Sequence, residues 1–167
     1  MDKRPMLKYN RFHKVKGAVL MKITIGSDHG AVELKEEVKK VLAEFEGVEV
    51  KDVGTFGTES VDYPDIAEKV CADVVSGEAE RGIVLCGTGL GISIAANKIK
   101  GIRCALCHDI FSAKMSREHN NANVLAMGGR VIGFGPAGEI VRAWLTTEFA
   151  GGRHERRVNK IMALENK

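Results

Sequence analysis

A run of glycines around one cysteine and one threonine is the segment of this sequence best suited to chemistry. The run reads Leu85-Cys86-Gly87-Thr88-Gly89-Leu90-Gly91. Glycines at alternate positions let backbone amides approach an anion, and a helix that starts behind them adds unpaired amide hydrogens. We expect Gly87, Gly89 and Gly91 to hold a phosphate or a developing oxyanion. The spacing matches neither the dinucleotide fingerprint nor a Walker loop, and a tight turn alone would use the same glycines.

Cys86 stands at the junction between an apolar run and this glycine turn. A position near a helix N-terminus favours the thiolate form of a cysteine, and a thiolate can act as a general base. The alternative is a buried cysteine that only fills space. Position alone favours this alternative slightly.

Charged and polar side chains elsewhere suit phosphate binding or proton transfer. Arg153 and Arg157 are four residues apart on a predicted helix, so they share a face that could grip a phosphate dianion; for an isolated run, a solvated basic face is the more common meaning. His29 and His119 stand in polar loops and could be general acids, bases or phosphate donors. Asp28 directly follows a strand, where sites gather in open sheets.

Cys104 and Cys107 have a spacing that invites a metal or redox interpretation. Two residues three apart on a strand point to opposite faces, so we reject that interpretation. No second pair offers zinc spacing, and we expect no metal. With no signal peptide, the four cysteines favour free thiols in a cytoplasmic protein.

The elements that must position these residues alternate between strands and helices. Strands are predicted at 23–26, 48–53, 82–86, 102–107 and 124–127, and helices at 31–45, from Pro64, at 92–98, 111–118, 136–145 and 154–164. This alternation predicts an α/β fold: a single-domain, Rossmann-like three-layer sandwich with a central parallel sheet of about five strands. Ligands of such sheets bind at the carboxyl ends of the strands.

Composition sets the outer limits. The chain has 167 residues, 44% of them hydrophobic, which suffices for one globular domain with a core. A basic segment, residues 1–20, precedes the first strand; we expect it to be an extension that is disordered or not native, and residues 21–167 to form the domain. The formal net charge is only +3, which gives little support to nucleic-acid binding. No apolar run approaches the roughly 20 residues of a membrane helix.

Several stretches together resemble one family, the type B ribose-5-phosphate isomerases, relatives of the two-component galactose-6-phosphate isomerases. The resemblance runs from Met21 almost to the C-terminus. The matching stretches are Ser-Asp-His at 27–29, Val-Asp-Tyr-Pro-Asp at 61–65, Leu-Cys-Gly-Thr-Gly-Leu-Gly-Ile-Ser-Ile-Ala-Ala-Asn-Lys at 85–98, Gly-Ile-Arg at 101–103, His-Asn-Asn-Ala-Asn at 119–123 and Gly-Gly-Arg-His-Glu-Arg-Arg at 151–157.

The resemblance implies catalytic roles. Cys86 matches the base that takes the proton beside the carbonyl, and Thr88 the residue that helps to move a proton between the enediolate oxygens. His119 resembles the residue that opens the furanose ring, with Asp28 placed to help. The resemblance also implies an anion hole made by Gly87, Gly89 and Gly91.

The resemblance implies binding roles as well. His29, Arg153 and Arg157 match the phosphate grip, and the resemblance places Arg130 at the same end. The positions that match substrate contacts are Tyr63 and Asn120. Neither a cofactor nor a metal is implied.

Family members are homodimers or dimers of dimers with shared sites. The resemblance therefore implies that Cys86 and Thr88 of one subunit meet His119, Arg153 and Arg157 of another. Ribose 5-phosphate is the expected substrate. The alternatives are allose 6-phosphate or galactose 6-phosphate, and a non-catalytic, flavodoxin-like phosphate-binding module; a nucleic-acid tether at residues 1–20 is a third.

Overall fold

The computed structural model describes residues 21–167, so the expectation for residues 1–20 lies outside the described residues. Five strands form one sheet, and every neighbouring pair is parallel. The strands are β1 (Met21–Ser27), β2 (Val48–Asp52), β3 (Arg81–Cys86), β4 (Cys104–Leu106) and β5 (Val124–Gly128). Their order is β2-β1-β3-β5-β4. Because all five run the same way, the sheet has one carboxyl edge and one amino edge.

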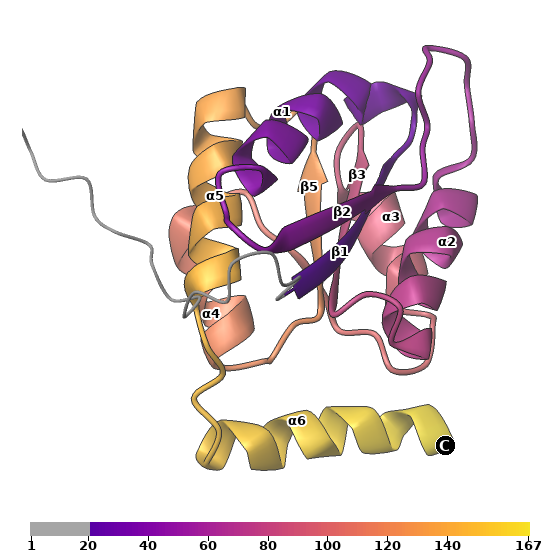
Figure 1. Ribbon diagram of the computed structural model, residues 1–167. Coiled ribbons are helices and arrows are strands. Elements are labelled where there is room, and N and C mark those ends of the chain that lie inside the picture. The colour runs from indigo at the N-terminus through magenta and orange to yellow at the C-terminus, as the bar shows by residue number, and fades with distance from the viewer. Residues whose placement is uncertain (1–20) are drawn as a thin grey trace, which may run out of the picture.

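Helices cover both faces of the sheet, which confirms the predicted three-layer α/β sandwich (Figure 1). The helices are α1 (Val32–Leu42), α2 (Tyr63–Ser76), α3 (Leu90–Ala96), α4 (Ile110–Glu118), α5 (Phe134–Thr146) and α6 (Arg153–Ala163), with short 3-10 turns η1 (His29–Ala31) and η2 (Leu164–Asn166). One face carries α1, α4 and α5, and the other carries α2 and α3. Helix α6 lies apart from both layers, across the amino edge of the sheet.

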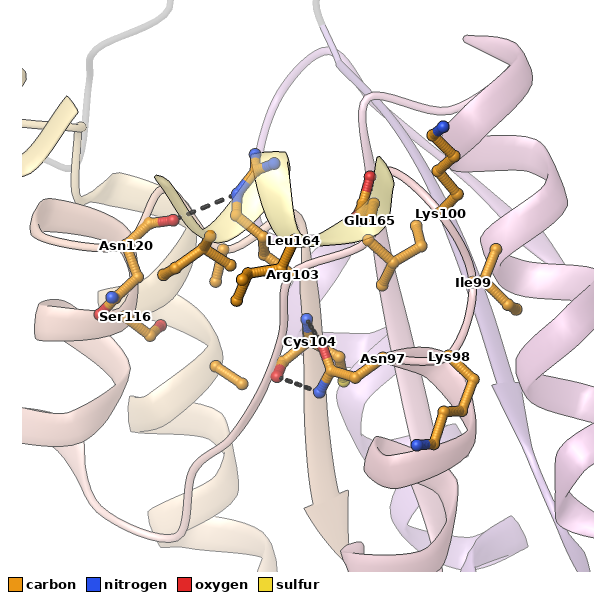
Figure 2. A pocket seen from close by; sticks show the side chains of 14 residues that line it. Asn97, Lys98, Ile99, Lys100, Arg103, Cys104, Ser116, Asn120, Leu164 and Glu165 are labelled. Atoms are coloured by element: carbon orange, nitrogen blue, oxygen red, sulfur yellow. Dashed lines mark hydrogen bonds between the residues drawn. The ribbon is translucent and has the colours of Figure 1, made fainter. Parts of the chain in front are cut away.

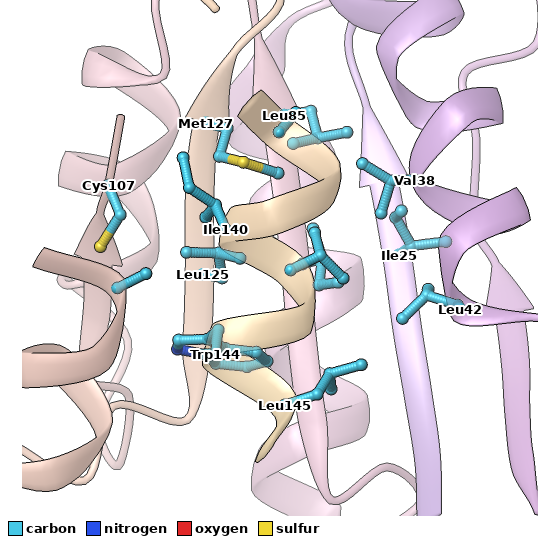
Figure 3. Close-up of a cluster of buried hydrophobic side chains, with 14 of the residues drawn as sticks. Ile25, Val38, Leu42, Leu85, Cys107, Leu125, Met127, Ile140, Trp144 and Leu145 are labelled. Atoms are coloured by element: carbon cyan, nitrogen blue, oxygen red, sulfur yellow. The ribbon is translucent and has the colours of Figure 1, made fainter. Parts of the chain in front are cut away.

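The core has two halves, one on each side of the sheet. Every residue of β3 and β5 is buried, as expected of central strands in a doubly covered sheet. Successive β3 residues alternate between the halves, because Ile83 and Leu85 pack with α1 and α5 whereas Val84 and Cys86 pack with α2 and α3. Figure 3 shows the first half, in which Trp144 of α5 lies beside Leu125 and Leu145.

Cys104 and Cys107 pack on opposite sides of the sheet, as predicted from their spacing. Burial raises the pKa of Cys107 to about 11 and that of Cys71 to about 12. Burial raises the pKa of Cys104 as well. These three thiols therefore stay protonated at neutral pH.

The predicted strand 102–107 is longer than the observed β4. Two asparagine side chains satisfy the backbone where that strand was expected to begin. Asn123 Oδ1 accepts the Arg103 N–H at 2.7 Å, and Asn97 bonds both the N–H and the carbonyl of Cys104, at 2.8 and 2.9 Å. The Arg103 N–H is already bonded to a side chain and cannot extend the strand ladder, so β4 begins at Cys104.

Candidate active site

Three turns interlock at the carboxyl edge of the sheet. The Asp28 N–H donates to the Leu85 carbonyl at 3.0 Å, and the Gly129 N–H donates to the Cys86 carbonyl at 2.9 Å. The Arg130 N–H donates to the Gly87 carbonyl, also at 2.9 Å. The turns after β1, β3 and β5 are thus bonded backbone to backbone, which brings Asp28, Cys86 and Arg130 together.

The turn after β3 surrounds the Cys86 sulfur with its own backbone. Sγ of Cys86 accepts the Gly89 N–H at 3.1 Å, and the side chain is 4% exposed. Gly89 has φ of +76°, and a Cβ there would lie 2.5 Å from Leu106 Cδ1. Only glycine meets both conditions. The conformation of Gly89 therefore holds an amide donor on the sulfur.

Two side chains frame this turn. A Cβ on Gly91 would lie 2.6 Å from Tyr63 Cζ, so the tyrosine ring rests against the backbone of the turn. A Cβ on Gly87 would lie 3.5 Å from Arg130 Nη1, so the guanidinium lies over Gly87. Thr88, in the same turn, is exposed. A phenol, a guanidinium and a hydroxyl thus border the exposed side of the turn.

Asp28 and His29 have their orientation fixed by backbone donors. Asp28 Oδ1 accepts the Gly30 N–H at 2.8 Å, and the residue is 7% exposed. His29 Nδ1 accepts the Val61 N–H at 3.3 Å. That bond requires a lone pair on Nδ1, so Nε2 of His29 is the nitrogen that carries a proton to donate.

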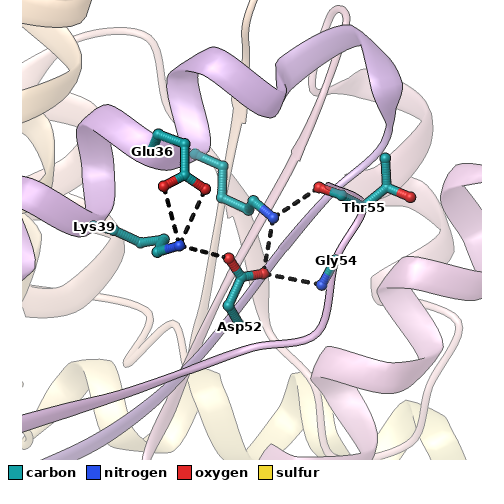
Figure 4. A network of polar contacts seen from close by, with 6 residues as sticks. Glu36, Lys39, Asp52, Gly54 and Thr55 are labelled. Atoms are coloured by element: carbon teal, nitrogen blue, oxygen red, sulfur yellow. Dashed lines mark hydrogen bonds and ion pairs between the residues drawn. The ribbon is translucent and has the colours of Figure 1, made fainter. Parts of the chain in front are cut away.

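A buried ion-pair network holds the loop between β2 and α2, which supplies Val61 (Figure 4). Lys35 has a side chain that is 0% exposed, and its Nζ lies 2.8 Å from both Asp52 Oδ1 and the Thr55 carbonyl. Lys39 binds the second Asp52 oxygen at 2.9 Å. Burial alone would raise the pKa of Asp52, but hydrogen bonds from Lys35, Lys39 and the Gly54 N–H outweigh it and lower that pKa.

The remaining predicted residues lie at the amino edge, where α4 and α5 end. His119 caps the C-terminus of α4, and Arg153 begins α6. The rings of His119 and His154 stack, with centroids 4.1 Å apart and an interplanar angle of 2°. Arg153 Nε donates to His154 Nε2 at 3.4 Å, and Arg157 is exposed one turn further along α6.

A cavity of 690 Å³ opens between α6 and the amino ends of the strands (Figure 2). Its lining includes Asn120, Arg103 and Lys98. Arg103 donates from Nε to the carbonyls of Asn120 and Asn121, at 3.2 and 3.1 Å. The arginine therefore fixes the chain next to His119.

Within one chain, the predicted site residues form two separate clusters. Those at the carboxyl edge are Asp28, His29, Tyr63, Cys86, Gly87, Thr88, Gly89, Gly91 and Arg130. Those at the amino edge are His119, Asn120, Arg153 and Arg157. Strand β5, which runs from one edge to the other, has five residues and spans roughly 15 Å at about 3.3 Å per residue. Side chains from the two clusters do not share one site in a single chain.

Sequence reasoning gave no role to two histidines that the structure places at these clusters. His154 stacks on His119, and no spacing in the sequence indicates that contact. His108 Nε2 accepts the Gly128 N–H at 3.0 Å, beside the backbone of Thr88. Because His108 follows a predicted strand, the sequence indicated that it lies at the carboxyl edge. The sequence did not indicate its hydrogen bond with Gly128.

Over residues 21–167, no three His, Cys, Asp or Glu side chains lie close enough together to hold a metal ion. Within the same range, no helix is long and apolar enough to cross a bilayer.

Comparisons with known proteins agree on one family. The family model described as Ribose/Galactose Isomerase matches residues 23–161. The ribose-5-phosphate isomerase B of Escherichia coli is 49% identical over 148 residues, which are 89% of this chain and 99% of that protein. A D-erythrulose-4-phosphate isomerase of Pectobacterium atrosepticum is 45% identical, over 85% of this chain and 93% of its own length.

The fold agrees as closely as the sequence. The structure of Clostridium thermocellum ribose-5-phosphate isomerase B superposes with a TM-score of 0.85 at 59% identity. The match covers 87% of this chain and 98% of the other.

Proposed function

We propose, from the premise that this chain belongs to the ribose/galactose isomerase family, that it interconverts ribose 5-phosphate and ribulose 5-phosphate. The chain is a sugar phosphate isomerase, and the proposal concerns its substrate and its base. The observation that carries it is the bond from the Gly89 N–H to Cys86 Sγ at the carboxyl edge. That donor fixes the position of the sulfur in the turn, next to the backbone amides proposed to bind the developing oxyanion.

The proposed reaction moves one proton through an enediolate. The Cys86 thiolate takes the proton from C2 of the open-chain aldose, the electron pair of that C–H bond forms the C1=C2 double bond, and the π pair of the C1 carbonyl moves to O1. The proton then returns to C1, while Thr88 helps to pass a proton from O2 to O1. Backbone amides of the glycine turn stabilise the developing negative charge because they are held in place before the reaction.

A second copy of the chain would complete the site. The two clusters are complementary in chemistry: one holds the base, and the other holds His119 for ring opening and Arg153 with Arg157 for the phosphate. Ile161 and Leu164 beside the cavity are 43% and 59% exposed, which supports an apolar contact with another chain. We propose a homodimer, or a dimer of dimers, in which the carboxyl edge of one copy meets the amino edge of its partner.

The first test is ketose formation from ribose 5-phosphate without added metal, comparing the intact chain with Cys86→Ala. Cys71→Ala removes another buried thiol and serves as the matched control. We expect the Cys86 variant to lose activity by about 10²- to 10⁴-fold while the control keeps it. Circular dichroism would check that both variants fold.

Each other outcome has a definite meaning. Equal activity in the intact chain and Cys86→Ala would place the base elsewhere. An intact chain inactive on ribose 5-phosphate would contradict the proposed substrate and direct the assay to allose 6-phosphate, galactose 6-phosphate and erythrulose 4-phosphate. Phosphate binding without turnover of any of them would favour the non-catalytic binding module.

A further inference from the structure

His154 and His119 form a stacked pair that joins two elements of the amino-edge cluster. His119 caps the C-terminus of α4, and His154 lies in the first turn of α6. Their rings are nearly parallel, 2° apart in plane, with 4.1 Å between centroids. His154 is 9% exposed, and His119 packs against its ring.

The two rings of the pair have opposite electrostatic surroundings. His154 accepts a hydrogen bond at Nε2 from the Arg153 guanidinium, which requires a lone pair there and therefore a neutral ring. On the other side, Glu118 Oε1 lies 3.8 Å from Nε2 of His119. Burial lowers the pKa of His154, and the charges of His119, Arg153 and Arg157 lower it further, against a smaller opposing effect of Glu118.

We propose that His154 is a positioning residue for ring opening: its stacked ring fixes the plane of His119 and so the direction in which the donor nitrogen of that ring points. This inference rests on the proposed function. It links the groups assigned to ring opening and to phosphate binding, because Arg153 bonds His154 and His154 stacks on His119.

Ring opening requires a proton donor in one defined place. In the furanose of ribose 5-phosphate, the C1–O4 bond breaks, O4 gains a proton, the C1 hydroxyl loses one and a C1 aldehyde forms. His119 would donate the proton to O4, and its donating nitrogen must therefore point at that oxygen. A misplacement of a catalytic group by about 1 Å can lower the rate of a reaction on the order of 100-fold. The His154 ring that packs behind His119 should therefore affect the rate of ring opening.

The experiment compares a substrate that needs ring opening with one that does not. Erythrose 4-phosphate carries its phosphate on O4, so it cannot close a furanose ring. Its ketose is erythrulose 4-phosphate, and a relative of this chain is named a D-erythrulose-4-phosphate isomerase. We expect His154→Ala to lower kcat on ribose 5-phosphate by about 10- to 100-fold, and on erythrose 4-phosphate by less than about 3-fold. His154→Phe keeps a flat ring and should restore most of kcat. Asn159→Ala, at an exposed position of α6, is the control.

Proton NMR of the ring hydrogens of His119 tests the geometry without any turnover. Removing the His154 ring removes its ring current, so the His119 resonances should move in His154→Ala and stay near their places in His154→Phe. Unmoved resonances in His154→Ala would overturn the proposal. If the intact chain does not turn over the tetrose, loss of kcat in His154→Ala with recovery in His154→Phe supports it, and loss in both variants contradicts it.

Two further results would be decisive. An equal loss on both substrates would show general damage to α6 and overturn the positioning role, as would unchanged kcat on ribose 5-phosphate. An intact chain that does not isomerise ribose 5-phosphate would instead contradict the proposed function, and this inference with it.

Discussion

The two edges of the sheet are built in different ways. At the carboxyl edge, backbone groups do most of the positioning: three turns bond one another through main-chain atoms, and Gly89 places its amide on the Cys86 sulfur. At the amino edge, side chains do it: His119, His154 and Arg153 orient one another where α4 ends and α6 begins.

The difference matches the task proposed for each edge. A developing oxyanion needs donors that do not move, and a backbone locked into interlocking turns provides them. A phosphate dianion needs positive charge, and arginine side chains on a helix at the rim of the molecule provide that. The carboxyl edge should therefore be sensitive to added atoms, and the amino edge to lost charges and rings.

The largest effect should come from mixing two inactive variants, because it tests whether the two edges serve one site. Cys86→Ala disables the carboxyl edge, and His119→Ala disables the amino edge. If the site is shared by two copies, half of the dimers refolded from an equal mixture are mixed, and each has one site with both edges intact. We expect about a quarter of the wild-type activity to return. No recovery over either variant alone would contradict a site shared between copies.

A single added methyl group should break the carboxyl edge. In Gly89→Ala, the new Cβ meets Leu106 Cδ1 at 2.5 Å and the Met127 carbonyl carbon at 2.8 Å, and φ of +76° adds strain. We expect a loss of about 2–5 kcal/mol in the free energy of unfolding, from a left-handed backbone and overpacking together. Urea denaturation measures it.

Gly57→Ala is the matched control, because a Cβ there meets nothing within 4 Å and Gly57 has no positive φ. Its free energy of unfolding should stay within about 0.5 kcal/mol of the wild type. Equal stability of Gly89→Ala would show that the turn can shift, and that its geometry is less fixed than the contacts indicate.

At the amino edge, Arg153→Ala should weaken substrate binding and leave the fold intact. Removing a guanidinium from a charged phosphate contact costs about 1.5–3 kcal/mol, which raises KM by about 10- to 100-fold. Arg156→Ala removes an exposed arginine from the same helix and should leave KM nearly unchanged. An equal KM for Arg153→Ala and the wild type would remove Arg153 from the phosphate site.

Sequence reasoning reached the carboxyl edge more fully than the amino edge, for a physical reason. A parallel sheet collects the carboxyl ends of its strands at one edge, so placing Asp28, Cys86 and Arg130 after strands already predicts that they meet. The glycine run could be recognised locally as well, because the positive φ of Gly89 is a property of the turn itself and favours glycine. The period of two along a strand likewise separated Cys104 from Cys107.

The amino edge depends on contacts between segments far apart in the chain. His154 meets His119 only because α5 returns the chain to the end of α4, and no local pattern encodes the stack. The late start of β4 has the same origin, since the side chain of Asn123 bonds the Arg103 N–H just before the strand. The periodic pattern of apolar residues predicted α4 and β4, but it contains no information on which side chains meet at the ends of these elements.

The smallest predicted effect tests an ion-pair network that supports the carboxyl edge. Hydrogen bonds from Lys35 and Lys39 hold the pKa of Asp52 below its ordinary value of 3.8. A carboxyl group with a lowered pKa stabilises the fold fully above its unfolded value, and the contribution is lost as the pH falls through the folded value. Urea denaturation at a series of pH values should therefore show stability declining below about pH 4, in part because of Asp52.

Asp52→Asn should be less stable than the wild type at pH 7, and the gap between the two should narrow as the pH falls below 3.8. The amide cannot ionise, and it leaves the buried Lys35 ammonium without its carboxylate. Because this network holds Thr55 in the loop that supplies Val61 to His29, KM for the substrate should rise modestly in the variant. A gap in stability that stays constant from pH 7 to pH 3 would mean that Asp52 acts through packing alone, and the carboxyl edge would then owe its shape entirely to its backbone.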